Sequence, residues 1–429
     1  MTPADPVAAL AEQRLSHRDK GIPVRAAGMT VRDFLAAAPR LSEFWTPLLV
    51  IDDETLEGNL AAMAAWCARN GFGLMPHGKT TMAPALWRRQ LGAGAAGITV
   101  ATAGQVRIAR AFGVHAIQLA NELVDPRGLR YVAGELSDPG FRFTCWADSV
   151  ETVEAMEREL AGIPLDRPID VCVELGAPGG RTGARTIEDA VAVATRIRRS
   201  GSLRLAGVAG YEGAVGHGRS DSDLAAVRRY LQSMLDLHAR LHDLYDDGRA
   251  MLTAGGSAYF DLVAEVFAPT TTGMPRTDYV LRAGAYITHD HGFYRSISPL
   301  DPSRPDAGAG MTLAPAARGY ARVVSRPEDG LAFLDAGKRD FPYDEGLPIP
   351  IAVAPDLGSA ASPMSGAEVV KLNDQHTFLR IEPASALPVG SVVELGLSHP
   401  CTMFDKWRFI PVVRRHGSDE VVDLVQTFF

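Results

Sequence analysis

The chain has 429 residues, of which 46% are hydrophobic and 22% are charged, so it is long enough to form two globular domains. Its net charge of -8 argues against a nucleic-acid partner, because non-specific binding to nucleic acid requires a basic surface. No apolar stretch reaches the length of a membrane span, and the first residues contain no apolar signal core. We therefore expect a cytoplasmic protein without a membrane partner. Four cysteines in so long a chain do not make a disulfide framework.

Residues 47–52 form the first apolar strand, and apolar residues then repeat at helical spacing from Leu56 to Cys67. From residue 72 onward, short β-rich segments alternate with amphipathic helices. Eight strands with helical crossovers favour a closed (β/α)8 barrel over an open sheet. No Gly-x-Gly-x-x-Gly turn follows an early strand, which weakens the open-sheet alternative. The eight expected strands cover residues 72–75, 97–101, 116–120, 142–146, 170–174, 203–209, 251–254 and 279–283.

The first of these strands leads into the segment from Gly73 to Thr81, with the sequence Gly-Leu-Met-Pro-His-Gly-Lys-Thr-Thr. Active sites of parallel barrels gather at such strand ends. The amine of Lys79, held between His77 and two threonines, is well placed to form a Schiff base with an aldehyde cofactor. The alternative is a surface lysine in a loop. The expected helix after it covers residues 82–91 and has Pro84 in its first turn.

Polar side chains follow two later strands. Arg181 lies in the glycine-rich loop 174–183, where its planar fork could contact a ring hydroxyl or a carboxylate. The alternative is a surface ion pair with a neighbouring glutamate. Tyr211 and Glu212 close the strand at 203–209, and either could face the mouth of the barrel.

Two glycine turns follow the last two barrel strands. The turn at 254–257 opens a helix, so its N–H groups and the helix dipole suit a phosphate. The turn at 281–286 adds a phenol. Barrels of this kind often hold phosphate after these strands. The predicted phosphate site therefore consists of Gly255, Gly256, Ser257, Gly284 and Tyr286.

The pattern of residue types changes after the last barrel strand. Residues 288–294 hold two histidines and an aspartate, which could bind a metal or form a polar turn between domains, and we favour the turn. Residues 298–317 are rich in Pro, Gly, Ala and Asp and predict a connection. From residue 318 to 429, strand patterns without helical periods predict a compact β domain. Its expected strands cover residues 320–324, 331–335, 368–371, 377–381, 391–395, 409–413 and 421–427.

The domain boundaries follow from these patterns. We expect an α/β chain with a cofactor-binding barrel over residues 47–295 and a β domain over residues 1–46 and 296–429. The strand at 48–51 could instead belong to the β domain.

Ser398-His399-Pro400-Cys401 is the sharper candidate for a metal site. An imidazole and a thiolate separated by one residue can reach the same cation, and nitrogen with sulfur suits zinc. Two protein ligands leave open positions, which is typical of a catalytic or substrate-binding metal. The alternative is a buried cysteine beside a hydrogen-bonded histidine.

With these motifs, the chain resembles the fold-type III pyridoxal-phosphate enzymes of the D-threonine aldolase and D-serine dehydratase group. It is closest to their amino-acid deaminase subgroup, through residues 77–84 and 398–401. The resemblance covers most of the chain, and it implies an alanine-racemase-like barrel, a β domain and a homodimer. Its other motifs are residues 48–52, 120–122, 174–183, 254–257, 281–286 and 398–407.

The resemblance also implies roles for single residues. Lys79, two residues after His77, matches the Schiff-base lysine, and Arg181 matches an arginine near the phenolic oxygen of pyridoxal phosphate. Tyr211 matches a residue near the pyridine nitrogen, and the two glycine turns match the phosphate cradle. His399 and Cys401 match the His-x-Cys metal pair of the D-serine dehydratases, whereas the aldolases show His-x-Asp.

Two departures from the family pattern leave the reaction open. The chain has Tyr211-Glu212-Gly213 where the aldolases usually have Tyr-His-Gly, and Gln375-His376 where Glu-His is usual.

The implied activity is a metal-assisted β-elimination that turns a D-serine-like β-hydroxy D-amino acid into a 2-oxo acid and ammonia. Lys79 would remove the α-proton. Removal of the hydroxyl proton instead would make the chain a retro-aldolase, and racemisation is a third outcome. A non-catalytic pyridoxal-phosphate carrier with this barrel would lack residues 318–429.

Overall fold

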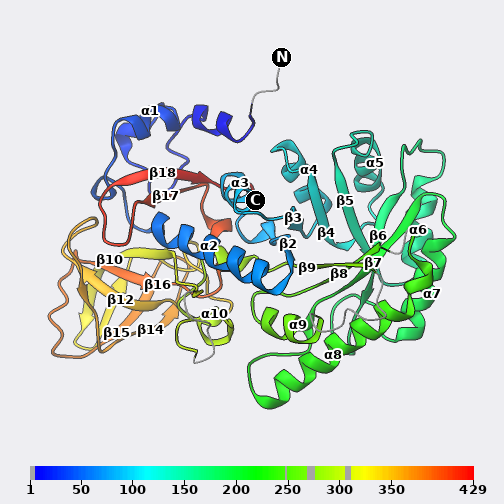
Figure 1. The fold of residues 1–429 in the computed structure, drawn as a ribbon. Coiled ribbons are helices and arrows are strands. Elements are labelled where there is room, and N and C mark those ends of the chain that lie inside the picture. The colour runs from blue at the N-terminus through cyan, green and yellow to red at the C-terminus, as the bar shows by residue number, and fades with distance from the viewer. Residues whose placement is uncertain (1–4, 247–248, 268–275, 305–310) are drawn as a thin grey trace. The chain divides into compact units, whose positions relative to one another are not determined.

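The computed structural model describes residues 5–246, 249–267, 276–304 and 311–429 (Figure 1). The chain divides into two compact units. The β unit consists of Met1–Met63, Thr80–Arg89 and Ala285–Phe429, and the barrel unit consists of Ala64–Lys79 and Gln90–Gly284.

The barrel unit is built on a parallel sheet of eight strands in the order β2-β9-β8-β7-β6-β5-β4-β3. This sheet confirms the eight βα-type strands that the sequence predicts. The strands are β2 (Gly73–Leu74), β3 (Ile98–Val100), β4 (Ala116–Glu122), β5 (Arg142–Ala147), β6 (Ile169–Leu175), β7 (Leu203–Gly210), β8 (Arg249–Ala254) and β9 (Arg276–Leu281).

The two ends of this sheet are joined by backbone hydrogen bonds. Ala96 N–H donates to the carbonyl of Leu74 at 2.7 Å, and Thr99 N–H donates to the carbonyl of Pro76 at 2.9 Å. A parallel bridge between His77 and Thr99 continues this pairing. The strands therefore close into the alanine-racemase-like barrel that the sequence predicts.

The crossover helices of the barrel unit begin at capping side chains. Thr102, Ser149, Thr186 and Ser220 each accept a hydrogen bond from the backbone N–H three residues later. Asp125 accepts from the N–H groups of residues 127 and 128. Such caps satisfy N–H groups that a helix cannot pair internally. The helices are α4 (Ala103–Ala111), α5 (Pro126–Glu135), α6 (Val150–Leu160), α7 (Ile187–Arg198), α8 (Asp221–Arg240) and α9 (Phe260–Phe267).

The β unit contains a sheet of ten strands. Its path is β13-β12-β16-β10-β1-β17-β18, with β11, β14 and β15 branching from β10. All seven C-terminal strands that the sequence predicts are present. The strands are β1 (Leu48–Asp52), β10 (Ala317–Glu328), β11 (Leu331–Leu334), β12 (Ile349–Ala354), β13 (Ser362–Pro363), β14 (Ala367–Leu372), β15 (Thr377–Ile381), β16 (Val392–Gly396), β17 (Phe409–Val413) and β18 (Val421–Gln426).

The placement of β1 differs from the predicted domain boundary at residue 47. This strand pairs antiparallel with β10 and parallel with β17, so its backbone hydrogen bonds lie within the β unit. Residues 285–295, which we expected in the barrel, also belong to the β unit. A strand belongs to the sheet that satisfies its N–H and C=O groups, and here both partners come from the C-terminal part of the chain.

The β unit also carries helices. The helix predicted to begin at residue 82 begins at Pro84, because Met82 adopts a positive φ of 40° that a right-handed helix excludes. Residues 298–304 and 311–316 form no helix or strand, as expected for a connection. The helices are α1 (Val31–Ala36), α2 (Asp53–Asn70, shared with the barrel unit), α3 (Pro84–Gly92) and α10 (Phe293–Ile297).

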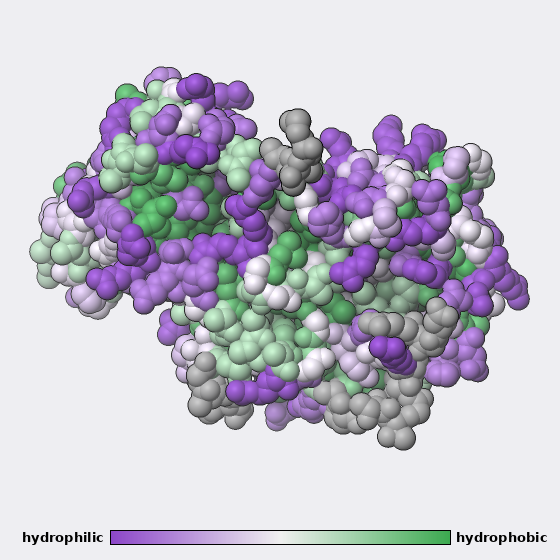
Figure 2. Space-filling view, turned by 45° about the horizontal axis from the view of Figure 1, so that its top comes forward, coloured by the Kyte–Doolittle hydropathy of each residue, from purple (hydrophilic) through white to green (hydrophobic). Residues whose placement is uncertain are grey.

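The surface mixes hydrophilic and hydrophobic side chains, and Figure 2 shows hydrophobic areas between hydrophilic ones on one face. Among the described residues, Trp45 and Val389 are each 60% exposed. None of the described helices combines the length and the apolar character needed to cross a membrane.

A buried amide ties the β unit together. Asn59 is 1% exposed, and its side chain donates to the carbonyls of Ile287 at 3.1 Å and Ala314 at 2.8 Å. Its carbonyl oxygen accepts from the N–H of Ala314 at 2.8 Å. One side chain thus satisfies three backbone groups of the segment that follows the barrel.

We therefore expect Asn59→Ala to lower the free energy of unfolding by roughly 3 kcal/mol, because buried backbone groups would lose their partners. Urea denaturation followed by circular dichroism measures this change. Glu54→Ala, an exposed substitution in the same helix, is the control and should change stability little. Equal stability of the two variants would contradict the role of Asn59.

Candidate active site

Lys79 lies where the sequence predicts, beyond the carboxyl end of the first barrel strand. The strand β2 ends at Leu74, and Lys79 sits in a short 3-10 turn, Gly78–Thr80. The backbone of His77 pairs with Thr99, which lies within β3. The lysine is therefore carried by a segment that is hydrogen-bonded into the barrel.

Positive charges gather around His77. Its Nδ1 atom is buried and has no hydrogen-bond partner among the described residues. Burial, followed by the charges of Lys79, Arg282 and Arg181, holds the pKa of His77 well below its usual value. His77 is therefore neutral at pH 7, and three cations lie close enough to act on it.

Arg282 was not among the predicted site residues. It is 5% exposed, and its guanidinium donates to Thr253 Oγ1 at 2.7 Å and to the carbonyl of Gly210 at 2.6 Å. It also packs over the ring of Trp146 at 4.9 Å. The residue stands in the predicted glycine turn 281–286. Its position directly after a buried strand is the sequence feature that could have identified it as a site residue.

The glycine turn after β8 binds a carboxylate in this structure. Gly255 N–H donates to Glu212 Oε2 at 3.0 Å, and Gly256 N–H donates to Glu212 Oε1 at 2.7 Å. Glu212 is fully buried. A Cβ atom on Gly255, whose φ is +85°, would meet Leu281 at 2.4 Å. The N–H groups that the sequence predicts for a phosphate thus donate to the Glu212 carboxylate in this structure.

Tyr211 and Arg181 lie together. The guanidinium of Arg181 stacks over the ring of Tyr211 at 4.6 Å. The N–H of Tyr211 donates to the hydroxyl of Tyr230 at 3.0 Å, and that hydroxyl donates to the carbonyl of Leu175 at 2.5 Å. A Cβ atom on Gly256 would lie 3.0 Å from the Tyr211 ring. The structure therefore brings together Arg181, Tyr211 and the glycine turn.

The remaining residues of the predicted phosphate cradle are divided between the two units. Ser257 is 9% exposed and directly follows the glycine pair. Gly284 is the last residue of the barrel unit. Tyr286 is 2% exposed, and it lies in the 3-10 segment Ala285–Ile287, which belongs to the β unit.

A pair of carboxyl groups at the ends of β4 and β6 was also missed. Glu122 and Glu174 are in contact, and the strand between them carries Trp146 in register with Glu122. Oε1 of Glu122, Oε2 of Glu174 and Nε1 of Trp146 are buried without partners in the described part of the chain. Burial, and then the charge of Glu174, raises the pKa of Glu122 to about 8. The pair therefore shares a proton at pH 7.

This raised pKa makes stability depend on pH. The folded protein holds the Glu122 proton up to about pH 8, whereas an unfolded carboxyl releases it near its ordinary value of 4.5. The resulting stability is fully present below that value and is lost as the pH rises through 8. Glu122→Gln imitates the protonated form. We expect it to match the native chain at pH 4.5 and to exceed its stability at pH 9 by roughly 1–3 kcal/mol.

Urea denaturation at the two pH values measures this difference. Glu151→Gln, an exposed substitution on α6, is the matched control. Its difference in stability from the native chain should not increase with pH. A constant difference between Glu122→Gln and the native chain would contradict a shared proton.

In the β unit, His399 is held by two aspartates. Its φ of 61° is left-handed, which is strained for a histidine. Its N–H donates to Asp290 Oδ2 at 2.8 Å, and its Nδ1 lies 2.6 Å from Asp344 Oδ2. Asp290 Oδ1 also accepts from the N–H groups of Gly292 and Tyr294 at 3.0 and 2.9 Å. Asp290 thus organises the 288–294 segment as a turn and fixes the backbone of His399.

Cys401 lies beside this histidine. Contact with Cys401, together with the charge of Asp344, overcomes the effect of burial and raises the pKa of His399 to about 9. The sulfur of Cys401 is 3.3 Å from Thr80 Oγ1, and Asp344 Oδ1 accepts from the hydroxyl of Thr402 at 2.6 Å. No group of three or more His, Cys, Asp or Glu side chains that could hold a metal occurs in the described ranges. No sequence motif identified Asp344 as a candidate site residue.

Comparison with known families decides the identity of this fold. The family model described as the alanine racemase N-terminal domain matches residues 51–266, which is half of the chain. The chain belongs to this family. The model described as a putative serine dehydratase domain matches residues 316–413. Together the two matches define the fold-type III pyridoxal-phosphate group that contains the D-threonine aldolases and D-serine dehydratases.

Similar proteins include both kinds of lyase. The chain is 28% identical over 374 residues to a D-threonine aldolase from Arthrobacter sp., covering 86% of this chain and 89% of that protein. It is 29% identical over 380 residues to a D-threo-3-hydroxyaspartate dehydratase from Delftia sp. (strain HT23), covering 83% and 90%. The structure of D-threonine aldolase from Filomicrobium marinum superposes with a TM-score of 0.74 at 24% identity, covering 91% and 97%.

Solved structures described as D-threo-3-hydroxyaspartate dehydratase include a histidine-to-alanine variant and a cysteine-to-alanine variant, with the two replaced positions two residues apart. The cysteine variant is described as a metal-free form, and it superposes with a TM-score of 0.69 at 21% identity, covering 91% of this chain and 99% of that one.

Proposed function

We propose that the chain is a pyridoxal-phosphate-dependent lyase that converts β-hydroxy D-amino acids to a 2-oxo acid and ammonia. The observation that carries this proposal is the pair His399 and Cys401, with the histidine fixed by Asp344. A histidine and a cysteine at this spacing are also the positions replaced in the dehydratase relative.

The barrel unit suits the cofactor of its family. Pyridoxal phosphate is anionic, and Lys79, Arg181 and Arg282 supply positive charge around His77. When bound, this cofactor withdraws electrons from the α-carbon of an attached amino acid. Lys79 would hold the cofactor and accept the α-proton, Arg181 and Tyr211 would face its ring, and Ser257 with the turn at 281–286 would approach its phosphate, because Glu212 engages the N–H groups of the other turn.

The β unit suits a cation with mixed nitrogen and sulfur ligands. Asp344 occupies Nδ1 of His399, which leaves Nε2 as the ligand atom. Cys401 supplies sulfur, so zinc fits better than magnesium or manganese. A zinc ion there would polarise the β-hydroxyl of the substrate as a Lewis acid.

A retro-aldol reaction is the second candidate, because the relative with 28% identity is named a D-threonine aldolase. Products distinguish the two reactions. With D-threo-3-hydroxyaspartate, elimination yields oxaloacetate and ammonia, whereas retro-aldol cleavage yields glycine and glyoxylate. We expect oxaloacetate and ammonia, and we expect pyruvate and ammonia from D-serine. Glycine as the main product would reject the dehydratase assignment.

The role of Lys79 predicts that Lys79→Ala abolishes both turnover and the visible absorbance of the cofactor-loaded protein, since no other amine of the site would replace it. Absorbance spectra of the purified proteins check this. Lys338→Ala, an exposed lysine in the β unit, should keep both properties. A visible band retained in Lys79→Ala would place the cofactor on another residue.

The metal assignment predicts that His399→Ala and Cys401→Ala lose stoichiometric zinc. Asp344→Asn should weaken zinc binding by about 10–100-fold, because the imidazole would lose the carboxylate that orients it. Calorimetric titration of chelated protein with zinc measures this without any substrate. Asp374→Asn, an exposed aspartate paired with Arg339, is the control. Unchanged zinc affinity in all three site variants would remove the metal from this proposal.

We further propose that the protein is a homodimer in the cytoplasm that acts on small D-amino acids. The family resemblance supports the dimer, and the net charge of -8 with 22% charged residues supports the location. Sedimentation equilibrium tests the dimer.

A further inference from the structure

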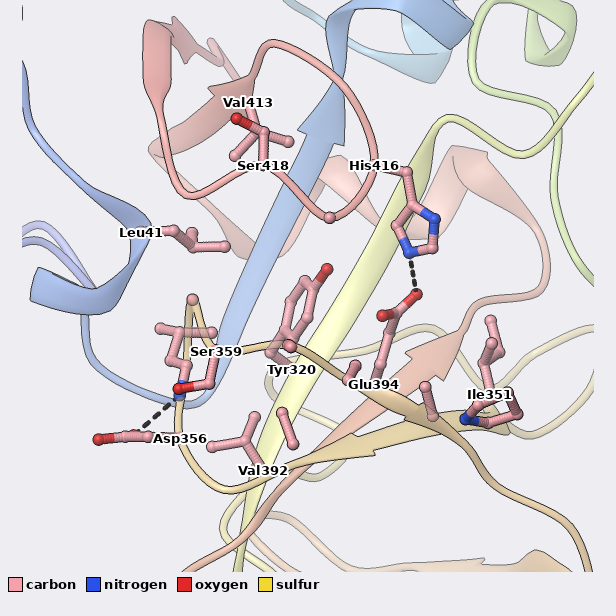
Figure 3. Close-up of a pocket in the computed structure, with 18 residues that line it drawn as sticks. Leu41, Tyr320, Ile351, Asp356, Ser359, Val392, Glu394, Val413, His416 and Ser418 are labelled. Carbon is pink, nitrogen blue, oxygen red and sulfur yellow. Dashed lines mark hydrogen bonds and ion pairs between the residues drawn. The ribbon is translucent and has the colours of Figure 1, made fainter.

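The β unit contains a pocket of about 310 Å³ that none of the predicted site residues lines (Figure 3). Its floor is formed by strands β10, β12 and β16, and loops at residues 356–361 and 416–418 close it. A volume of this size is at the lower end of small-molecule sites. Most of the wall is aliphatic, through Leu41, Ile351, Leu357, Val392 and Val413.

One end of the pocket is polar. Glu394 is 4% exposed, and its Oε1 atom lies 2.9 Å from Nε2 of His416, a contact that Figure 3 marks with a dashed line. The ring of Tyr320 stands beside Glu394, and its hydroxyl points into the space between Leu41 and His416 (Figure 3). Burial, and then the nearby Glu394 carboxylate, raises the pKa of Tyr320, so its phenol keeps its proton.

The charges around Glu394 do not balance. Arg318 lies 3.0 Å from Glu394 and 3.8 Å from Asp52, and both carboxylates are almost fully buried. One guanidinium therefore faces two carboxylates. His416 adds a positive charge only when it is protonated. Asp356, another carboxylate of the wall, is already paired with Arg322 at 2.6 Å. When His416 carries no proton, the polar end therefore has one more negative than positive charge, beside an aliphatic wall.

We propose that this pocket binds a small organic cation, with its ammonium group at Glu394 and Tyr320 and its apolar body against the aliphatic wall. A carboxylate ligand would be repelled, because the excess charge is negative. The described residues provide no set of three side chains there that could hold a metal ion. The proposal does not depend on the lyase activity, since the pocket lies within the β unit.

The probe is N,N-dimethylbenzylamine, a tertiary amine that is cationic at pH 7 and forms no imine with an aldehyde cofactor. Benzyl alcohol and benzoate are its neutral and anionic counterparts of similar shape. Calorimetric titration of the cofactor-loaded protein should show saturable binding of the amine at one site per chain. We expect the alcohol to bind about tenfold more weakly, and benzoate to bind weakest of the three.

Variants locate the binding. Glu394→Gln should weaken binding of the amine about tenfold and leave binding of the alcohol unchanged. Ala354→Leu places an isobutyl group in the wall of the pocket and should weaken binding of both ligands. This variant keeps the test valid if Glu394→Gln does not fold. Lys79→Ala should bind the amine as the native chain does, which separates this site from the cofactor site. The proposal is overturned by no saturable binding of the amine, by benzoate binding as tightly as the amine, or by amine affinity that both pocket variants leave unchanged.

Discussion

The electrostatic balance around buried Arg282 is the constraint on which the barrel end depends. Its guanidinium is removed from water, so the charge must be met by nearby acceptors and carboxylates. It donates to the end of β7 and to Thr253, and the charges of Glu212 and Glu174 oppose the effect of burial on its pKa. The same charge helps to keep His77 neutral.

The barrel and most of the β domain could be predicted because their signals are local. Alternating apolar residues mark each strand, and helical periods mark each crossover, so the positions of β2 to β9 follow from the chain itself. The strand β12 lacks this clarity, since Pro350 interrupts its pattern. The sheet to which β1 belongs depends on partners more than 260 residues away, and no local pattern contains that information.

The candidate site shows the same division. Lys79, Arg181, Tyr211 and the glycine turns stand in motifs, so their residue types identify them. Glu212 could not be foreseen from a motif. Its two carboxylate oxygens accept from the N–H groups of Gly255 and Gly256, which the sequence predicts would bind a phosphate. Which donors remain for a ligand depends on three-dimensional pairing. Such pairing also joins Glu122 to Glu174, which are separated by a whole βαβ unit.

The pair His399 and Cys401 illustrates how ligand spacing and ligand orientation differ. Spacing alone allows either a metal site or a packed pair. The structure holds His399 in a left-handed conformation, and the hydrogen bond from its N–H to Asp290 offsets that strain. Asp344 then selects one ring nitrogen. A packed pair would not require a fixed backbone and a fixed imidazole at once. A cation with directional ligands does require both, and the proposed metal site rests on this requirement.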